Sequence, residues 1–325
     1  MMKKLWQAGS GPIRFFFFLS LVVMMFYGLF IVMAGSDDPA RTDIHPEGWD
    51  QYSVYGVEIP EKVAFAGEPV PTDLFDVREA LDRELLSNTY FHSQTIRLIK
   101  LSHRFFPLIE PILAAHGIPD DFKYLAVAES GLDQVISPDR AVGFWQLLEG
   151  TAQEYGLEVN DQVDERYHIE KSTGAACRYI LESFEKYGNW TMAAASYNAG
   201  RRGIDKQIER QKIENYYDLL LNEETERYLF RVVSFKLIFE NPEQYGITLS
   251  EKDIYKPVPH TLVTINGPVE DFADFAREHH TNYKILKMLN PWLRETKLTN
   301  AAGKTYRIKI PEKGFRRIHA WEPLQ

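Results

Sequence analysis

The chain has 325 residues, and 45% of them are hydrophobic, which is enough for one large core and a smaller second module. Its formal net charge is -9 and no long run of Lys or Arg occurs, which excludes the electrostatic pattern of a nucleic-acid-binding protein. A single cysteine, Cys177, excludes an intrachain disulfide, a thiolate zinc cluster and an iron–sulfur centre.

The first feature along the chain is an uncharged apolar stretch from Phe15 to Ala34, about as long as a membrane-spanning helix. Basic side chains precede it and aspartates follow it, so the positive-inside rule predicts a cytoplasmic tail at residues 1–14 and an extracytoplasmic remainder. A cleavable export signal is the alternative, because Val32 and Ala34 could precede a cleavage site. The length of the stretch favours a retained signal anchor.

Residues 35–72 contain five prolines and little periodicity, which indicates an extended linker or a strap lying over the following domain. From Asp73 the pattern becomes helical, with apolar residues at spacings of three and four up to Leu85 and again from Ile96 to Ile112. Further helices with polar starts and glycine ends are expected at residues 119–131, at 172 or 173 to 188, and at 189–200. The sequence therefore predicts a mainly α fold, with a compact helical domain at 73–242.

The composition changes after Pro242. An extended run near Val263 is followed by two short helical patterns and by an alternating run from Tyr306 to Ile310, which predicts a βααβ module at residues 257–311. We expect this module and the helical domain to have separate cores. Three histidines, His260, His279 and His280, lack the spacing of metal ligands, so neither a metal nor a cofactor is expected.

The candidate catalytic residue is Glu129, in the segment KYLAVAESGLD, at the C-terminal end of an apolar helix. The negative end of the helix dipole and poor solvation beside Leu125 and Val127 both raise the pKa of a carboxyl group. A raised pKa would make Glu129 a proton donor near neutral pH. A solvated glutamate at a helix end is the alternative, and the tripeptide ESG alone favours it.

Four blocks of sequence, taken together, change that balance. They occur in the order KYLAVAESGLD, GFWQL followed by Thr151 and Ala152, AAASYNAG, and Glu224-Thr225 with Tyr228-Leu229. In this order the blocks resemble the transglycosylase domain of the soluble lytic type, and their flanks are most similar to the membrane-bound lytic murein transglycosylase D group. The resemblance covers residues 73–240 and implies a lysozyme-like helical fold.

The resemblance implies a reaction as well as a fold. Glu129 would protonate the glycosidic oxygen between N-acetylmuramic acid and N-acetylglucosamine in peptidoglycan. It would then accept the proton of the muramoyl 6-hydroxyl as that oxygen attacks C1, leaving a 1,6-anhydromuramoyl end. Because the substrate's N-acetyl group stabilises the oxocarbenium centre, no second carboxylate is required. Asp133 and Asp139 are therefore expected to be surface or cap residues.

The same resemblance assigns five substrate-binding residues. Ser130 would hydrogen-bond near the glutamate, while Gln146, Tyr197 and Asn198 would line the cleft. Tyr228 would approach the catalytic carboxyl and, by a hydrogen bond to its neutral form, keep it protonated.

Neighbouring residues are expected to support the fold of the domain. Phe144, Trp145 and Trp190 are expected in the core, whereas Gly143 would allow the close approach of a sugar and Gly200 would end a helix. Two departures from the family pattern, Glu149-Gly150 in place of a proline and Ser196 in place of an alanine, predict altered loop geometry rather than lost catalysis.

The module at 257–311 resembles a degenerate LysM domain, a class that binds glycans containing N-acetylglucosamine. Pro268-Val269-Glu270 stands where that family has a short polar turn, so glycan binding by the module stays open. The expected partners are peptidoglycan strands and the membrane, with the catalytic domain on the extracytoplasmic side. Two alternative functions also stay open: a lysozyme-like glycan hydrolase with a second carboxylate, and a non-catalytic, membrane-anchored peptidoglycan-binding protein.

Overall fold

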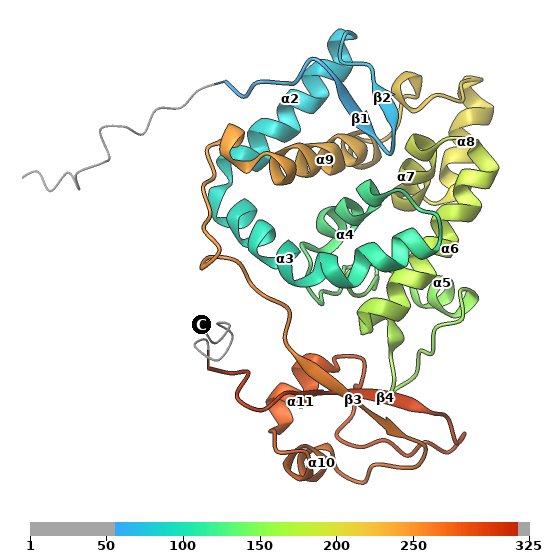
Figure 1. Cartoon of the computed structure of the whole chain (residues 1–325). Helices are drawn as coiled ribbons and strands as arrows, with labels where there is room; N and C mark the ends of the chain where they lie inside the picture. The colour runs from blue at the N-terminus through green and yellow to red at the C-terminus, as the bar shows by residue number, and fades with distance from the viewer. Residues whose placement is uncertain (1–55, 318–325) are drawn as a thin grey trace, which may run out of the picture. The chain divides into compact units, whose positions relative to one another are not determined.

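The computed structural model describes residues 56–317 (Figure 1). The predicted cytoplasmic tail at 1–14, the predicted membrane helix at 15–34 and the first part of the predicted linker lie outside the described residues. Between residues 56 and 317, no helix has both the length and the apolar character needed to cross a membrane.

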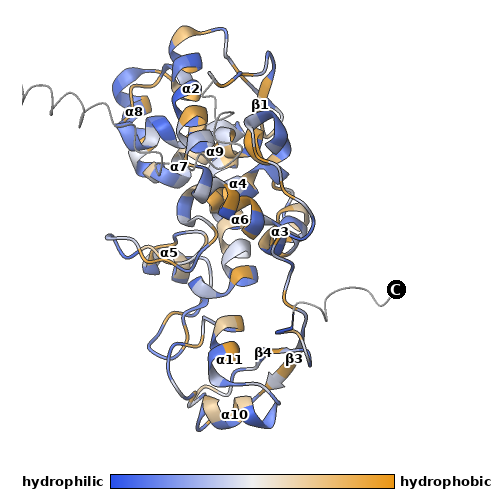
Figure 2. Cartoon of the chain, turned by 90° about the vertical axis from the view of Figure 1, so that its left-hand side faces the viewer, coloured by the Kyte–Doolittle hydropathy of each residue, from blue (hydrophilic) through white to orange (hydrophobic). Residues whose placement is uncertain are grey.

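A mainly helical domain makes up most of this region. Its helices are α2 (Phe75–Tyr90), α3 (His92–Ala115), α4 (Lys123–Ser130), α5 (Glu149–Glu154), α6 (Ile169–Tyr187), α7 (Trp190–Ala199), α8 (Arg201–Gln211) and α9 (Glu223–Glu240). Short 3-10 turns stand at Asp120–Phe122, Glu165–Tyr167, Tyr216–Asp218 and Pro242–Tyr245. Helix α4 packs against α3 and α9, while α9 also packs along α2. Helix α8 buries only Ile204 and is largely hydrophilic in Figure 2.

Glycine and asparagine caps set two of the helix boundaries that position the site. Helix α4 ends at Gly131, which adopts the left-handed conformation and donates its N–H to the Val127 carbonyl. Helix α7 begins after Asn189, whose side chain accepts the N–H of Met192. Both boundaries were predicted from the sequence and are confirmed.

The start of α6 differs from the prediction. The helix begins at Ile169, three residues before the expected cap at Ser172 or Thr173. The hydroxyls of Ser172 and Thr173 both donate to the Ile169 carbonyl inside the helix. Hydroxyl side chains favour helix caps but can also bond to a preceding carbonyl within a helix, which is why the sequence pattern was misleading.

Residues 56–72 are the described part of the stretch predicted to be a linker or a strap. Strand β1 (Val63–Phe65) pairs antiparallel with β2 (Glu68–Val70), and Val63, Phe65 and Val70 are buried in the helical core. The Glu68 carboxylate accepts N–H groups from Trp190 and Thr191 at the start of α7. This part of the stretch is therefore a strap that is packed onto the domain.

The C-terminal module has the βααβ order predicted from the sequence. Its elements are β3 (His260–Ile265), α10 (Phe272–Glu278), α11 (Tyr283–Leu289) and β4 (Tyr306–Pro311). The two strands pair antiparallel, with Val263 opposite Ile308. Phe272, Leu286 and Trp292 are buried beneath the sheet.

The module has a buried cluster of its own, distinct from the main core of the helical domain, but this cluster includes three residues of that domain. Val142, Val163 and Tyr167 belong to the same buried apolar cluster as Phe272 and Leu286 of the module. A backbone bridge joins Val163 to Leu293, and the N–H of Asp164 donates to the Trp292 carbonyl at 2.9 Å. The expected two cores are therefore present, but the module's core extends across a seam to these three residues of the helical domain. A small module buries too little apolar surface alone, and it gains more by sharing a seam.

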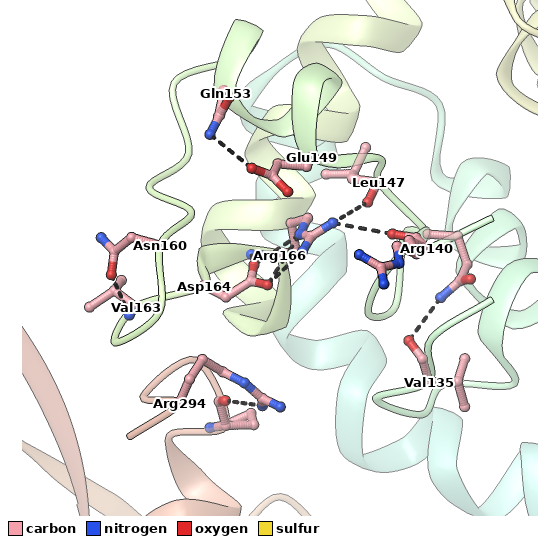
Figure 3. A network of polar contacts seen from close by, with 12 residues as sticks. Val135, Arg140, Leu147, Glu149, Gln153, Asn160, Val163, Asp164, Arg166 and Arg294 are labelled. Carbon is pink, nitrogen blue, oxygen red and sulfur yellow. Dashed lines mark hydrogen bonds and ion pairs between the residues drawn. The ribbon is translucent and has the colours of Figure 1, made fainter. Parts of the chain in front are cut away.

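Arg166 connects that seam to a loop at residues 135–147, which we call the cleft loop (Figure 3). It forms a buried ion pair with Asp164, at 2.7 Å, and donates to the carbonyls of Arg140 and Leu147. A Cβ atom on Gly143 would lie 2.4 Å from the Arg166 carbonyl oxygen. The close approach expected at Gly143 is therefore made by the protein's own backbone and not by a sugar.

Candidate active site

Glu129 occupies the last turn of α4, where its side chain is partly accessible to solvent. Tyr228 reaches it from α9 and donates its hydroxyl to Glu129 Oε1 at 2.6 Å. The tyrosine is only 2% exposed, so this hydrogen bond is largely shielded from water. Two residues that are 99 positions apart in the sequence thus meet at one carboxyl group.

Burial is the main cause that raises the pKa of Glu129, to about 7. The hydrogen bond from Tyr228 acts in the opposite direction, because a hydroxyl that donates to a carboxylate favours the charged form. The charge of Glu224 raises the pKa further, and that of Arg231 lowers it. The approach of Tyr228 was predicted correctly, but burial, rather than the tyrosine, keeps the acid protonated.

Three of the predicted site residues bind backbone carbonyls close to the acid. The Ser130 hydroxyl lies 3.0 Å from the Ala126 carbonyl oxygen and 3.1 Å from that of Phe144. Tyr197 donates to the Trp145 carbonyl at 2.6 Å, and Gln146 Nε2 donates to the Gly143 carbonyl at 2.7 Å. These contacts tie the cleft loop to α4 and α7.

Gln146 itself has a left-handed backbone, with φ of 45°. A residue with a Cβ atom rarely adopts this conformation, and the surrounding structure must hold it there. Its side-chain bond to the Gly143 carbonyl is one such restraint. The loop beside Glu129 is therefore held in a defined shape by its own polar contacts.

The sixth predicted residue, Asn198, joins α7 to the first turn of α9. Its Oδ1 accepts the Thr225 hydroxyl at 2.9 Å, and its Nδ2 lies 3.4 Å from Glu224 Oε1. Glu224, Tyr228 and Arg231 follow one another at spacings of four and three, which places them on one face of α9. The sequence motif contained Glu224 and Tyr228 but assigned a role to Tyr228 alone, whereas this periodicity also indicates Glu224 and Arg231 as charged neighbours of the site.

The aromatic residues expected in the core divide into two groups. Phe144 and Trp145 are 2% and 0% exposed, and Trp145 Nε1 donates to the Thr173 hydroxyl. Trp190 is only partly buried and stacks on Phe184 with ring centroids 3.8 Å apart. Core packing is thus confirmed for the first two and partial for the third.

The two departures from the family pattern fit without strain. Glu149 is the first residue of α5, where the positive end of the helix dipole favours an acidic side chain. Ser196 is fully buried, but its hydroxyl donates to the Ala193 carbonyl at 2.8 Å. The hydroxyl that replaces a methyl hydrogen of alanine therefore has a partner.

Asp133 and Asp139 are exposed, and Asp133 pairs with Arg97 at 2.8 Å. Glu224, rather than either aspartate, is the carboxylate whose charge acts on Glu129. Within residues 56–317, no group of three or more His, Cys, Asp or Glu side chains is arranged to hold a metal ion.

Comparison with protein-family models defines the class of this fold and site. Residues 109–220 match the transglycosylase SLT domain, and residues 261–314 match the soluble lytic transglycosylase C-terminal LysM-like domain. The chain thus carries an SLT transglycosylase domain followed by a LysM-like domain.

Among individual proteins, the chain is distantly related to membrane-bound lytic murein transglycosylase D. It is 26% identical to that protein from Escherichia coli (strain K12) over 243 residues, which are 73% of this chain and 52% of the relative. The protein of the same name from Escherichia coli O6:H1 gives the same values. The chain therefore spans about half the length of the curated relatives it matches.

The SLT match has a boundary that bears on the site. It includes Glu129, Gln146 and Tyr197 but ends at residue 220, before α9 begins at Glu223. The Tyr228 hydroxyl that contacts Glu129 thus comes from a helix beyond the matched segment.

Proposed function

We propose that this chain is a peptidoglycan lytic transglycosylase with Glu129 as its single catalytic acid and base. The observation that supports it most is the partly buried contact between Tyr228 and a carboxyl group whose pKa is raised to about 7. A group that titrates near the working pH can donate a proton in one step and accept one in the next. The SLT match around Glu129 supplies the substrate class.

The reaction proceeds in two steps and consumes no water. Protonated Glu129 gives its proton to the oxygen of the β-1,4 bond between N-acetylmuramic acid and N-acetylglucosamine, and the C1–O bond breaks. The substrate's N-acetyl group stabilises the positive charge that develops at C1. The Glu129 carboxylate then takes the proton of the muramoyl 6-hydroxyl as that oxygen bonds to C1. The products are a 1,6-anhydromuramoyl end and a free N-acetylglucosamine end.

The other site residues bind the glycan and shape its cleft. Ser130 and Tyr197 fix the backbone of the cleft loop, and Gln146 and Asn198 line the cleft. Tyr228 stabilises the carboxylate that forms after the first proton transfer, because its hydroxyl donates to that group.

The proposal extends to the two ends of the chain. Residues 15–34 anchor the protein in the membrane, with the catalytic domain at 73–242 on the extracytoplasmic side. The module at 257–311 contacts the same glycan strands. Its Pro268–Glu270 turn is held by Val269, which is buried and exchanges backbone hydrogen bonds with Leu298.

The anchor has its own test, independent of catalysis. Fractionation of cells should recover the protein with the membrane, and external protease should reach the region after residue 35. A soluble protein whose first residue is Gly35 would show that the segment is a cleaved signal.

Mass spectrometry of digested sacculi tests the catalytic proposal. New 1,6-anhydromuramoyl ends are expected from purified protein. Reducing muramoyl ends would instead identify a hydrolase, for which Glu224 is the candidate second carboxylate because its charge acts on Glu129. The absence of new ends, with binding to sacculi retained, would identify a non-catalytic binding protein.

A further inference from the structure

A second buried carboxylate, Glu84 on α2, lies outside every motif that points to catalysis. Its side chain is 2% exposed and meets arginines from α9 at both oxygens. Glu84 Oε1 is 2.6 Å from Arg227 Nε, and Oε2 is 3.6 Å from Arg231 Nε. Arg83 of α2 is 3.6 Å from Oε1. A buried carboxylate is tolerated when cations pair with it, and these contacts supply the pairing.

The two arginines flank the tyrosine that contacts the acid. Arg227 and Arg231 are four residues apart on α9, and Tyr228 and Arg231 are three apart, so Arg231 lies beside both residues on the helix surface. The hydrogen bond that Arg227 donates to Glu84 raises the pKa of Arg227, which keeps that guanidinium charged. Glu84 thus fixes the side of α9 on which both guanidinium groups lie.

The charge of Arg231 also reaches the active site. It lowers the pKa of Glu129 and that of Tyr228. The other titratable groups that interact with Glu129 are Tyr228 and Glu224 of α9 and Tyr197 of α7. Arg231 is the cation of this set. Any movement of its guanidinium away from Glu84 and toward α4 would stabilise the carboxylate form of Glu129.

We propose that Glu84 is a positioning residue, which binds Arg227 and Arg231 on the α2 side of α9 and keeps Arg231 away from the Glu129 carboxyl group. The acid then retains its proton near neutral pH although a guanidinium lies close by. Glu84 touches no substrate in this role. It lies before residue 109, where the SLT match begins. The role in activity rests on the proposed function, whereas the effect on the titration of Glu129 does not.

The first test is the pH profile of kcat/KM for anhydromuropeptide release. In the parent protein we expect activity to fall as pH rises through about 7, where Glu129 loses its proton. Glu84→Gln should move this fall to lower pH by on the order of half a unit, because Arg231 is released. Glu84→Asp keeps the charge and should retain the parental profile, whatever its melting temperature.

Arg231→Gln provides the matched control. Alone it should move the fall in activity to higher pH, since a cation near Glu129 is removed. In the Arg231→Gln background, Glu84→Gln should cause no further shift, because no cation remains to be released. A folded Glu84→Gln protein with the parental profile would overturn the proposal. An equal shift in the Arg231→Gln background, or the same shift in Glu84→Asp, would also overturn it.

A second measurement needs no activity. The melting temperatures of each protein and of its Glu129→Gln counterpart, compared across pH, report where Glu129 titrates in the folded state. This titration should move down in Glu84→Gln and up in Arg231→Gln. If the parent released no anhydromuropeptides, the proposed function would fail while this comparison still tested Glu84. If Glu84→Gln did not fold, an unchanged titration in Arg231→Gln would decide against the proposal.

Discussion

Two partly buried glutamates of the helical domain, Glu129 and Glu170, have opposite electrostatic surroundings. Burial raises the pKa of Glu129 to about 7, and its one direct partner is the neutral hydroxyl of Tyr228. Burial also acts to raise the pKa of Glu170, but His168 and Lys309 outweigh it and hold that pKa well below its usual range. Glu170 therefore stays ionised near neutral pH at the seam with the C-terminal module. Glu129 is free to change its protonation state.

The difference shows which feature turns a glutamate into an acid catalyst. Burial is common to both residues, so burial alone does not identify the acid. What distinguishes Glu129 is that the cation whose charge acts on it, Arg231, lies 3.6 Å from the carboxylate of Glu84 on another helix. A cation brought to Glu129, or removed from Glu170, should make the two residues more alike.

The largest expected effect follows removal of the titrating carboxyl group. Glu129→Gln preserves shape but cannot transfer a proton, and general acid–base catalysis contributes about 10² to 10⁴ in rate. Release of anhydromuropeptides should fall by at least that factor. The matched controls Asp133→Asn and Asp139→Asn change exposed carboxylates and should retain most activity.

Glu224→Gln sharpens this test, because its carboxylate acts on Glu129 only through its charge in the proposed mechanism. A modest loss of activity is expected. Inactivation as complete as that of Glu129→Gln would favour a two-carboxylate hydrolase. Parental activity in Glu129→Gln would exclude this residue as the catalyst.

The next largest effect concerns the seam that contains Glu170. Deletion of residues 257–325 should destabilise the helical domain, because Val142, Val163 and Tyr167 lose the apolar cluster that buries them. Each large apolar side chain that is exposed costs about 1.5–3 kcal/mol. Denaturant unfolding should therefore show a loss of several kcal/mol. Unchanged stability of the truncated protein would mean that the seam contributes little.

Sequence reasoning succeeded where local signals were sufficient. The glycine after α4, the asparagine before α7, the extended run of β3 and the alternation in β4 each locate an element within a few residues. The position of Glu129 at a helix end and its approach by Tyr228 were also correct, the first from local pattern and the second from family resemblance.

The remaining features depend on contacts between distant segments. Glu84 has no motif, and its importance appears only when α2 is placed against α9. The seam between the two units could not be predicted, because Val163 is simply one apolar residue in an irregular loop until Leu293 pairs with it. Whether Tyr228 raises or lowers the pKa of Glu129 depends on which atom donates their hydrogen bond, and the sequence does not show this. Sequence patterns identify elements and motifs, but they do not specify these pairings.

A smaller effect, on stability rather than activity, should also distinguish Glu129 from Glu170. Folding raises the pKa of Glu129 from its ordinary value of 4.5 to about 7. Its contribution to the free energy of unfolding is therefore fully present below pH 4.5 and is lost as pH rises through about 7. Glu129→Gln should thus match the parent near pH 4 and exceed its stability at pH 8. The gain should be about 1 to 3 kcal/mol, because each tenfold change in proton affinity between the unfolded and folded states corresponds to about 1.4 kcal/mol. Thermal melts that differ equally at both pH values would contradict this.

The smallest effect should have the opposite sign, and Glu170→Gln measures it. Because His168 and Lys309 hold the pKa of Glu170 below its usual range, its contribution is present above the ordinary value of 4.5 and is lost as pH falls. Glu170→Gln should therefore be less stable than the parent at pH 7, by about 1 kcal/mol for a partly exposed ion pair. The difference should shrink below pH 4.5, and the pH profile of activity should stay unchanged. A variant that was equally destabilised at pH 3 and pH 7 would show that Glu170 acts through packing rather than charge. The electrostatic contrast with Glu129 would then not hold for Glu170.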